Sequence, residues 1–183
     1  MILLSGGHYE DKPGARYRSD SEYPNTFRMA INIHELLTYD YGIIASIIPP
    51  TSLNSKTDYV NKIHQQCGVD LAVEIHLNSA ANTGEDFKVQ GSETLFHPKS
   101  RLGRKYAKHV QNIIGETFTP NRGIKEGWFR GDESLGVLGF LRYTRCPALV
   151  LEPEFIQNVH IWKTQEDELC RVIAEALSSV IKK

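Results

Sequence analysis

The sequence predicts a single α/β domain with a central twisted, mostly parallel (mixed) sheet and helices on both faces. Short apolar runs of strand length alternate with longer amphipathic stretches along the whole chain. The length of 183 residues suits one domain with a real hydrophobic core. No internal repeat, low-complexity tract or linker divides the sequence, so residues 1–183 are taken as one domain.

Strands are expected where apolar residues run together between turn-forming residues. The first run, Met1–Ser5, is followed directly by glycines, and a charged, glycine-containing loop is expected from there to Ser21. Because sites in such sheets form at the carboxyl ends of strands, the residues that follow each run deserve inspection. The further runs are Ile43–Ile48, Leu71–His76, Ser92–His97, Val137–Tyr143 and Ala148–Glu152.

Helices are expected where apolar residues recur every three or four positions. This spacing occurs over Pro24–Tyr41, where proline suits a first helical turn and Gly42 a stop. It occurs again over Arg101–Phe118, and Asp58–Cys67 is a shorter candidate. The clearest stripe lies near the C-terminus, with acids before it and lysines after it, which complements the helix dipole. Its apolar members are Leu169, Val172, Ile173, Ala176, Leu177, Val180 and Ile181.

Composition excludes several classes of protein. Hydrophobic residues are 40%, charged residues 23% and the net charge is -1, so no basic footprint for nucleic acid is present. No apolar run is long enough to cross a membrane. The four apolar residues at the N-terminus are too few for a signal peptide, so we expect synthesis in the cytoplasm.

The three cysteines do not predict a disulfide framework. Cys67, Cys146 and Cys170 are far apart, odd in number and form no Cys-x-x-Cys pair. We therefore expect reduced, mostly buried thiols.

Two histidines and a glutamate are candidates for a metal site. His8 directly follows the first strand and His76 ends another, so both should project from the same sheet edge. Glu22 lies at the entrance to the first long helix, after a loop that could fold back over that edge. Two imidazoles and a carboxylate form a zinc set that leaves a fourth position for water. Another divalent metal stays an alternative, because affinities for such a site overlap.

Glu152 is the candidate catalytic base. It ends the last predicted strand, on the same edge as the two histidines. A carboxylate near a zinc-activated water can accept its proton and later pass it to a leaving amine. These four residues are sufficient for metal-assisted hydrolysis of an amide.

Each of these residues alone also has an ordinary structural explanation. His8 could cap a turn, and Glu22 could be a helix-start acid stabilised by the dipole. Glu74 and His76 lie in a buried strand and need polar partners. Glu152 ends an apolar run, where a buried carboxylate destabilises the fold unless it is paired with a cation, binds a metal or serves in catalysis. Convergence of four residues on one edge favours a site.

The remaining histidines and the common catalytic motifs carry no comparable signal. We expect His34, His64 and His109 within helices and His97 and His160 near strand ends or loops, all without a catalytic role. The sequence contains no Gly-x-Ser-x-Gly, no phosphate-binding Gly-Lys-Ser/Thr loop, no Gly-x-Gly-x-x-Gly and no His-Glu-x-x-His.

With these residues the sequence resembles the zinc-dependent N-acetylmuramoyl-L-alanine amidases often labelled amidase type 3. The resemblance covers nearly the whole chain. It is carried by Gly7-His8, Pro13-Gly14-Ala15, Glu22, Val69-Asp70, Ile75-His76-Leu77-Asn78, Gly91-Ser92-Glu93-Thr94, Arg122-Gly123-Ile124-Lys125, the block Leu141–Glu152 and Phe155-Ile156-Gln157-Asn158.

The resemblance implies a six-stranded sheet and one Zn²⁺ per chain, bound by His8, Glu22 and His76, with Glu152 as the catalytic glutamate. It implies hydrolysis of the amide between the lactyl group of N-acetylmuramic acid and L-alanine in peptidoglycan. Asn78 and Arg142 match family positions near the cleft and are weaker candidates for substrate binding. We expect neither nucleic-acid binding nor membrane insertion; the sequence leaves the oligomeric state open, with a monomer favoured.

The sequence also departs from the family pattern. Glu74 stands where the family has serine, and Leu4-Ser5-Gly6-Gly7 replaces the usual opening before His8. Pro153 and Glu154 follow Glu152 where the family has an apolar residue and glycine. Strand alternation places Glu154 on the same face as Glu152, which makes it a rival for the role of base.

Two other functions stay open at this point. One is a zinc hydrolase of a small acylated amino acid or peptide, which a deep pocket with an arginine clamp would favour. The other is a catalytically silent module that binds cell wall. A phage-type lysin that acts on the cell wall after release fits a chain used entirely by its catalytic domain, and so does a domain taken from a larger protein.

Overall fold

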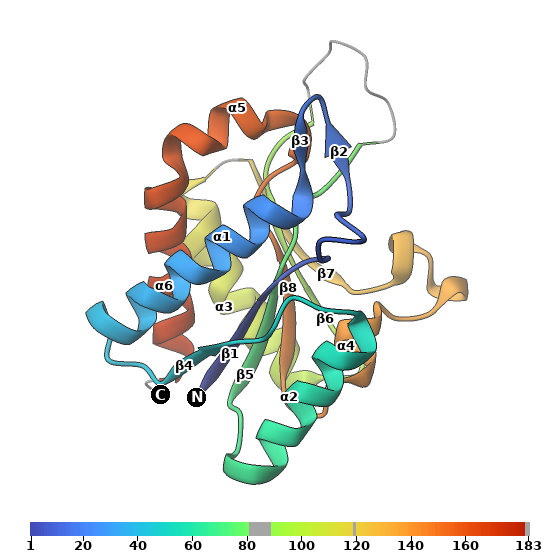
Figure 1. Ribbon diagram of the computed structural model, residues 1–183, viewed down its shortest axis with the longest axis vertical. Coiled ribbons are helices and arrows are strands. Elements are labelled where there is room, and N and C mark those ends of the chain that lie inside the picture. The colour runs from blue at the N-terminus through green and yellow to red at the C-terminus, as the bar shows by residue number, and fades with distance from the viewer. Residues whose placement is uncertain (81–88, 119, 182–183) are drawn as a thin grey trace.

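A six-stranded mixed sheet forms the centre of the computed structural model, which describes residues 1–80, 89–118 and 120–181 (Figure 1). The strand order is β4-β1-β5-β8-β6-β7. Neighbouring strands are parallel, apart from β6 and β8, which are antiparallel. The predicted fold class and the implied number of strands are confirmed. The strands are β1 (Ile2–Gly6), β4 (Ala45–Ile47), β5 (Leu71–Ile75), β6 (Ser92–Phe96), β7 (Asn121–Glu126) and β8 (Ala148–Glu152).

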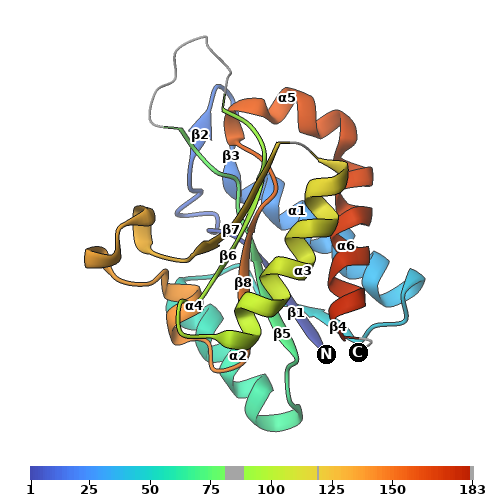
Figure 2. The ribbon, with the colours of Figure 1, turned by 180° about the vertical axis from the view of Figure 1, so that it is seen from behind.

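Helices cover both faces of the sheet (Figures 1 and 2). One face packs against α1 (Glu22–Glu35), α3 (Arg101–Thr117) and α6 (Glu166–Ile181), and the other against α2 (Leu53–Cys67) and α4 (Gly139–Tyr143). Successive strand side chains point to opposite faces. Ile2 and Leu4 of β1 therefore join the first core, whereas Leu3 joins the second.

One expectation about the strands was wrong, and one strand was not expected. The run Val137–Tyr143 is not a strand, because α4 occupies Gly139–Tyr143 and buries Phe140 and Leu141 against the second face of the sheet. A short apolar run buried in this way fits a helix as well as a strand. The strand that sequence analysis missed is β7, a polar edge strand that contains Gly123 at φ +78°. Its pairing with β6 shifts register there, so no regular alternation marks it.

Helix boundaries also differ from expectation. Helix α1 begins at Glu22, before Pro24, and passes at its end into the π-helical turn Leu36–Asp40. Helix α2 begins at Leu53, five residues before Asp58, because Ser52 caps a polar first turn by accepting a hydrogen bond from the Ser55 N–H. Lys182 and Lys183, which were expected to follow α6, lie outside the described residues.

The remaining elements are short. The segment expected to be a loop up to Ser21 contains the antiparallel strands β2 (Arg16–Tyr17) and β3 (Asp20–Ser21). Between β7 and α4 the chain projects as an arm with two 3-10 turns, at Phe129–Gly131 and Glu133–Leu135 (Figure 1). Helix α5 (Val159–Trp162) lies between the 3-10 turns Ile156–Asn158 and Lys163–Gln165 and precedes α6.

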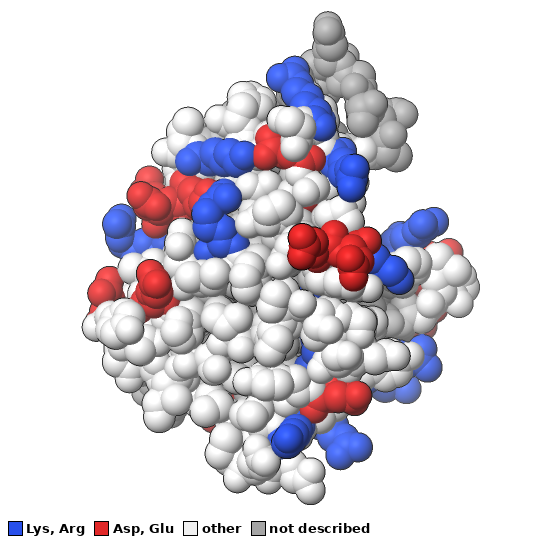
Figure 3. All heavy atoms as spheres, in the orientation of Figure 1, with Lys and Arg blue, Asp and Glu red and all other residues white. Residues whose placement is uncertain are grey.

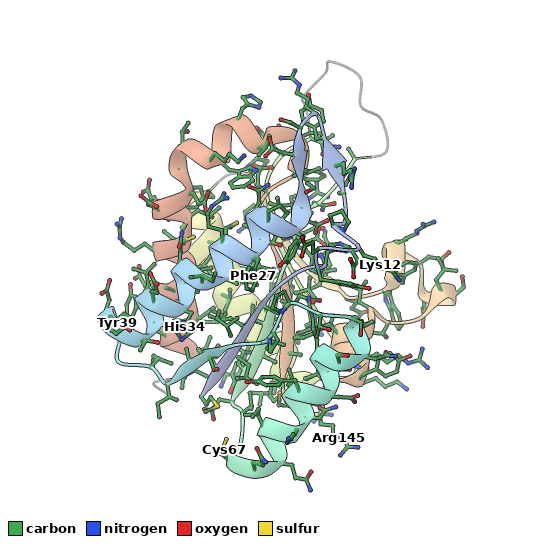
Figure 4. All side chains as sticks on the ribbon, viewed as in Figure 1. Lys12, Phe27, His34, Tyr39, Cys67 and Arg145 are labelled. Atoms are coloured by element: carbon green, nitrogen blue, oxygen red, sulfur yellow. The ribbon has the colours of Figure 1, made fainter. Side chains whose placement is uncertain are left out.

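All three cysteines are free thiols, as predicted. Cys146 and Cys170 are buried, whereas Cys67 is exposed at the end of α2 (Figure 4).

The surface has mixed charge. On the face drawn in Figure 3, acidic and basic side chains alternate and neither sign forms a continuous field. None of the helices in the described part of the chain has the length and apolar character needed to cross a membrane.

Candidate active site

His8, Glu22 and His76 lie together at the carboxyl ends of β1 and β5. One candidate ligand atom from each residue lies within 4.8 Å of the others. The histidines meet because β1 and β5 are parallel neighbours, with Gly6 opposite Ile75. Their ring centroids are 5.1 Å apart. Glu22, the first residue of α1, completes the group from the helix that crosses this edge.

The Glu22 carboxylate bridges the two imidazoles. Its Oε1 is 2.8 Å from His76 Nδ1 and its Oε2 is 3.1 Å from His8 Nε2. The backbone N–H groups of Leu77 and Ala15 also donate to these oxygens, each at 3.0 Å. Burial opposes the charged form, but the hydrogen bonds from His76 and His8 hold the pKa of Glu22 below its usual value. The carboxylate is therefore charged and suited to a cation.

Two glycines allow the backbone to approach this group closely. Gly14 has φ +79°, and a Cβ there would lie 2.4 Å from His8 Cδ2 and 2.6 Å from Glu22 Oε2. A Cβ on Gly7 would lie 2.5 Å from Cε1 of the His76 ring. A larger residue at either position would displace a candidate ligand.

A buried ion pair lies on the far side of His76, and sequence analysis did not identify it. Glu74 Oε2 is 3.1 Å from His76 Nε2, and Lys56 Nζ donates to Glu74 Oε1 at 2.9 Å. Although burial favours the neutral ring, the hydrogen bonds to Glu22 and Glu74 raise the pKa of His76 to about 10. The sequence indicated that Glu74 needs a partner, but no motif pointed to Lys56.

Glu152 lines the same cavity as His8, His76 and Glu74, which has a volume of about 480 Å³. Among the residues that the structure describes, its carboxylate has no hydrogen-bond partner. Burial raises the pKa of Glu152 to about 7. The positive charge of nearby His76 lowers this pKa, whereas the negative charges of Glu93 and Glu22 raise it further. Such a group can exchange a proton near neutral pH.

Glu154 points away from this cavity. Strand β8 ends at Glu152, so the alternation expected to align the two acids stops there. Glu154 Oε1 accepts hydrogen bonds from Gly91 N, Phe155 N and Asn158 Nδ2, at 2.9, 2.8 and 3.1 Å. Its carboxylate is thus occupied in holding the loop after β8, and the geometry favours Glu152 as the base.

The two weaker candidates, Asn78 and Arg142, do not line the cavity. Asn78 Nδ2 donates to Glu93 at 2.9 Å, and its Oδ1 accepts from the Ser79 N–H. Arg142 is exposed on α4, with its guanidinium over the Tyr143 ring. In this arrangement Asn78 supports the sheet edge, and Arg142 lies outside the cavity.

The cavity reaches the surface of the molecule. Leu53 and Phe129 line it and are themselves 39% and 45% exposed. Lys12 contributes a cation from the loop after β1 (Figure 4). The rest of the lining is formed by Tyr9, Thr51, Ser52, Asn54, Lys56, Leu138, Gly139, Phe140 and Val150.

The other histidines lie away from the candidate metal ligands. His34, His64 and His109 occupy α1, α2 and α3, as expected. His64 accepts from the Val69 N–H, and His109 is 2.7 Å from the Ser179 hydroxyl. His97 follows β6 and His160 lies in α5.

Comparison with known proteins gives a consistent result. Residues 2–183 match the family described as N-acetylmuramoyl-L-alanine amidase. The chain is 26% identical over 167 residues to the sporulation-specific N-acetylmuramoyl-L-alanine amidase of Bacillus subtilis (strain 168), across 86% of this chain and 57% of that protein. It therefore spans little more than half the length of this relative.

Solved structures share the fold. The crystal structure of N-acetylmuramoyl-L-alanine amidase from Clostridium difficile 630 superposes with a TM-score of 0.83 at 20% identity, covering 100% of this chain and 96% of that one. The putative N-acetylmuramoyl-L-alanine amidase from Neisseria meningitidis gives 0.71 at 27% identity, covering 99% and 95%. Because the family match extends over residues 2–183, the chain belongs to the N-acetylmuramoyl-L-alanine amidase family.

Proposed function

We propose that this domain hydrolyses the amide bond between the lactyl group of N-acetylmuramic acid and L-alanine in peptidoglycan. One observation carries the proposal: one candidate ligand atom from each of His8, Glu22 and His76 lies within 4.8 Å of the others, and the two histidines line the same cavity as Glu152. Membership of the amidase family supports the choice of bond. The site of action would be the bacterial cell wall.

We infer that the three clustered residues bind one zinc ion. Two imidazoles and a carboxylate match the ligand types of catalytic zinc sites. The buried Glu22 carboxylate already spans both histidines and carries negative charge where a cation would lie. When bound at such a site, zinc activates water and polarises the scissile carbonyl.

Glu152 is the proton carrier in this proposal. Its carboxylate accepts a proton from the attacking water and delivers it to the nitrogen of L-alanine as the C–N bond breaks. The second proton of the water stays on the new carboxyl group and then passes to the amine, so the products are a lactyl carboxylate and an L-alanine ammonium group, and atoms and charge balance. A pKa raised to about 7 by burial suits a group that must both take and give a proton.

The cavity favours a polymer over a small acylated amino acid. Its described lining contains no arginine to clamp a free carboxylate. The exposed Leu53 and Phe129 extend its wall to the surface, so a long chain could continue beyond it. The walls contributed by Leu138, Phe140 and Val150 are apolar and would exclude water around the scissile bond.

Analysis of the new chemical ends tests the proposal. Purified peptidoglycan is digested with the parent protein, with a chelator and with zinc restored. We expect new L-alanine amino termini without new reducing sugars, suppressed by the chelator and recovered with zinc. New peptide ends elsewhere would identify a peptidase. No cleavage by zinc-loaded protein would contradict the proposal and support a silent wall-binding module or a hydrolase of small substrates.

A further inference from the structure

We propose that Glu74, fixed by Lys56, is a positioning residue that holds the His76 ring for metal binding. The inference rests on the metal site of the proposed function and adds residues outside its ligand set. Glu74 and Lys56 are 6% and 2% exposed, so the pair is built into the interior beneath the site.

The first step in the argument is that the two nitrogens of His76 face different carboxylates. Nδ1 lies 2.8 Å from Glu22 Oε1, on the side of the candidate ligands. Nε2 lies 3.1 Å from Glu74 Oε2, on the opposite side. A carboxylate that accepts the second N–H of a metal-binding histidine fixes its tautomer and orientation and raises its basicity. Glu74 is placed to accept the Nε2 proton, which leaves Nδ1 for the metal.

The second step is that Glu74 is not itself a ligand. The described group whose donor atoms lie within 4.8 Å of one another comprises His8, Glu22 and His76, without Glu74. The other oxygen of the Glu74 carboxylate, Oε1, accepts a hydrogen bond from the Lys56 ammonium at 2.9 Å. Glu74 therefore acts through His76.

The third step is that Lys56 makes a buried Glu74 tolerable and fixes its direction. Lys56 Nζ donates both to Glu74 and to the backbone carbonyl of Gly6, at 2.6 Å. These contacts join α2 to β5 and to the end of β1, close to His8. A carboxylate buried without such a partner would be strongly destabilising.

Apart from Glu22 and Glu74, which face its two nitrogens, the His76 ring meets the His8 ring edge-to-face, with ring centroids 5.1 Å apart. It packs against the backbone of Gly7, where even a Cβ would lie 2.5 Å from the ring. A glycine surface constrains the distance of the ring but supplies no donor or acceptor to select a tautomer.

Zinc affinity and stability, measured separately, test the inference. The variants are Glu74→Gln, the double variant Lys56→Met/Glu74→Gln, and Glu166→Gln as a matched control. Glu166 accepts two hydrogen bonds from Arg28, at 2.8 and 2.7 Å, and joins α1 to α6 outside the cavity. The readouts are the zinc dissociation constant by chelator competition, the thermal midpoint of the metal-free protein, and the ¹⁵N NMR signals of the His76 ring.

We expect Glu74→Gln to weaken zinc binding by roughly 10–100-fold, the usual effect of losing an outer-shell partner. The double variant should recover thermal stability, because no single charge is left buried, but not zinc affinity. Glu166→Gln should lower stability and keep the parent's zinc affinity. In zinc-loaded parent protein, the proton should reside on Nε2 of His76.

The inference about Glu74 would be overturned, with the metal site intact, if the parent and Glu74→Gln bind zinc equally well, or if the double variant recovers zinc affinity together with stability. A proton on Nδ1 in the zinc-loaded parent would do the same. A parent that binds no zinc would overturn the proposed metal site itself, so the two failures are distinguishable.

Discussion

Glu152 differs from the other acids at this sheet edge in having no hydrogen-bond partner among the described residues. Glu22 is bonded to two histidines, Glu74 to a lysine and Glu93 to Asn78 and Arg122. Burial without such a bond destabilises the carboxylate and raises the pKa of Glu152 to about 7. A buried carboxylate with a raised pKa is typical of catalytic groups, whose environment is unfavourable for stability.

This pKa predicts a pH-dependent stability effect of Glu152→Gln in the metal-free protein. Between its usual value of 4.5 and about 7, Glu152 binds more proton in the folded than in the unfolded state. Its stabilising contribution is therefore present below pH 4.5 and lost as pH rises through 7. Glutamine removes this loss, so the variant should gain about 1–3 kcal/mol in free energy of unfolding over the parent near pH 8.

Urea denaturation of both metal-free proteins near pH 8 and near pH 4 provides the measurement. The gain should vanish at the lower pH, where the parent carboxyl is protonated in both states. An equal gain at both values would show that Glu152 keeps an ordinary pKa in the folded protein.

At the scale of elements, the sequence predicts those parts of the fold whose residues are locally distinctive. The runs that became β1, β5 and β8 are apolar and lead directly into His8, His76 and Glu152, so the strand ends and the candidate site could be predicted together. Strand β7 could not, because a polar edge strand with a register shift lacks a periodic signal.

The missing parts of the site depend on packing between elements. Lys56 and Glu74 are 18 residues apart, and their contact exists only because α2 packs beneath the end of β5. No local pattern encodes that approach. The same applies to Glu154, whose direction is set by the loop after β8 and by Gly91, 63 residues away.

The loop between β1 and α1 supplies a prediction at this scale. Gly14→Ala combines an unfavourable φ of +79° with a Cβ that would overlap His8 and Glu22. Gly68→Ala, at φ +77° with nothing within 4 Å, carries the backbone strain alone. Both variants should lose roughly 1–2 kcal/mol of stability, and only Gly14→Ala should also lose zinc affinity.

Isothermal titration with zinc and thermal unfolding of the two variants check this expectation. Equal zinc affinity in both would show that the loop adjusts to a side chain at Gly14 without moving the ligands.

At the scale of the whole molecule, a bound metal should link regions that are distant in sequence. His8 follows β1, Glu22 begins α1 and His76 follows β5, so the three candidate ligands join the first helix to two central strands. A ligand that binds only the folded state stabilises it by mass action, by about 2.7 kcal/mol at 100 times its dissociation constant.

Zinc should therefore raise the thermal midpoint of the parent, and a chelator should reverse the rise. His76→Ala should show a much smaller shift, because it removes one of three ligands. Differential scanning calorimetry at fixed protein concentration gives the comparison. An undiminished shift in His76→Ala would remove His76 from the ligand set.

The most direct test of the account compares peptidoglycan cleavage by Glu152→Gln and Glu154→Gln after both are loaded with zinc. The rate at which new L-alanine amino termini appear is measured beside zinc content. We predict that Glu152→Gln retains the parent's zinc and loses roughly 10²–10⁴-fold in rate, the usual contribution of a general acid–base, while Glu154→Gln stays near the parent rate. A fully active Glu152→Gln beside an inactive Glu154→Gln would contradict the assignment of the base.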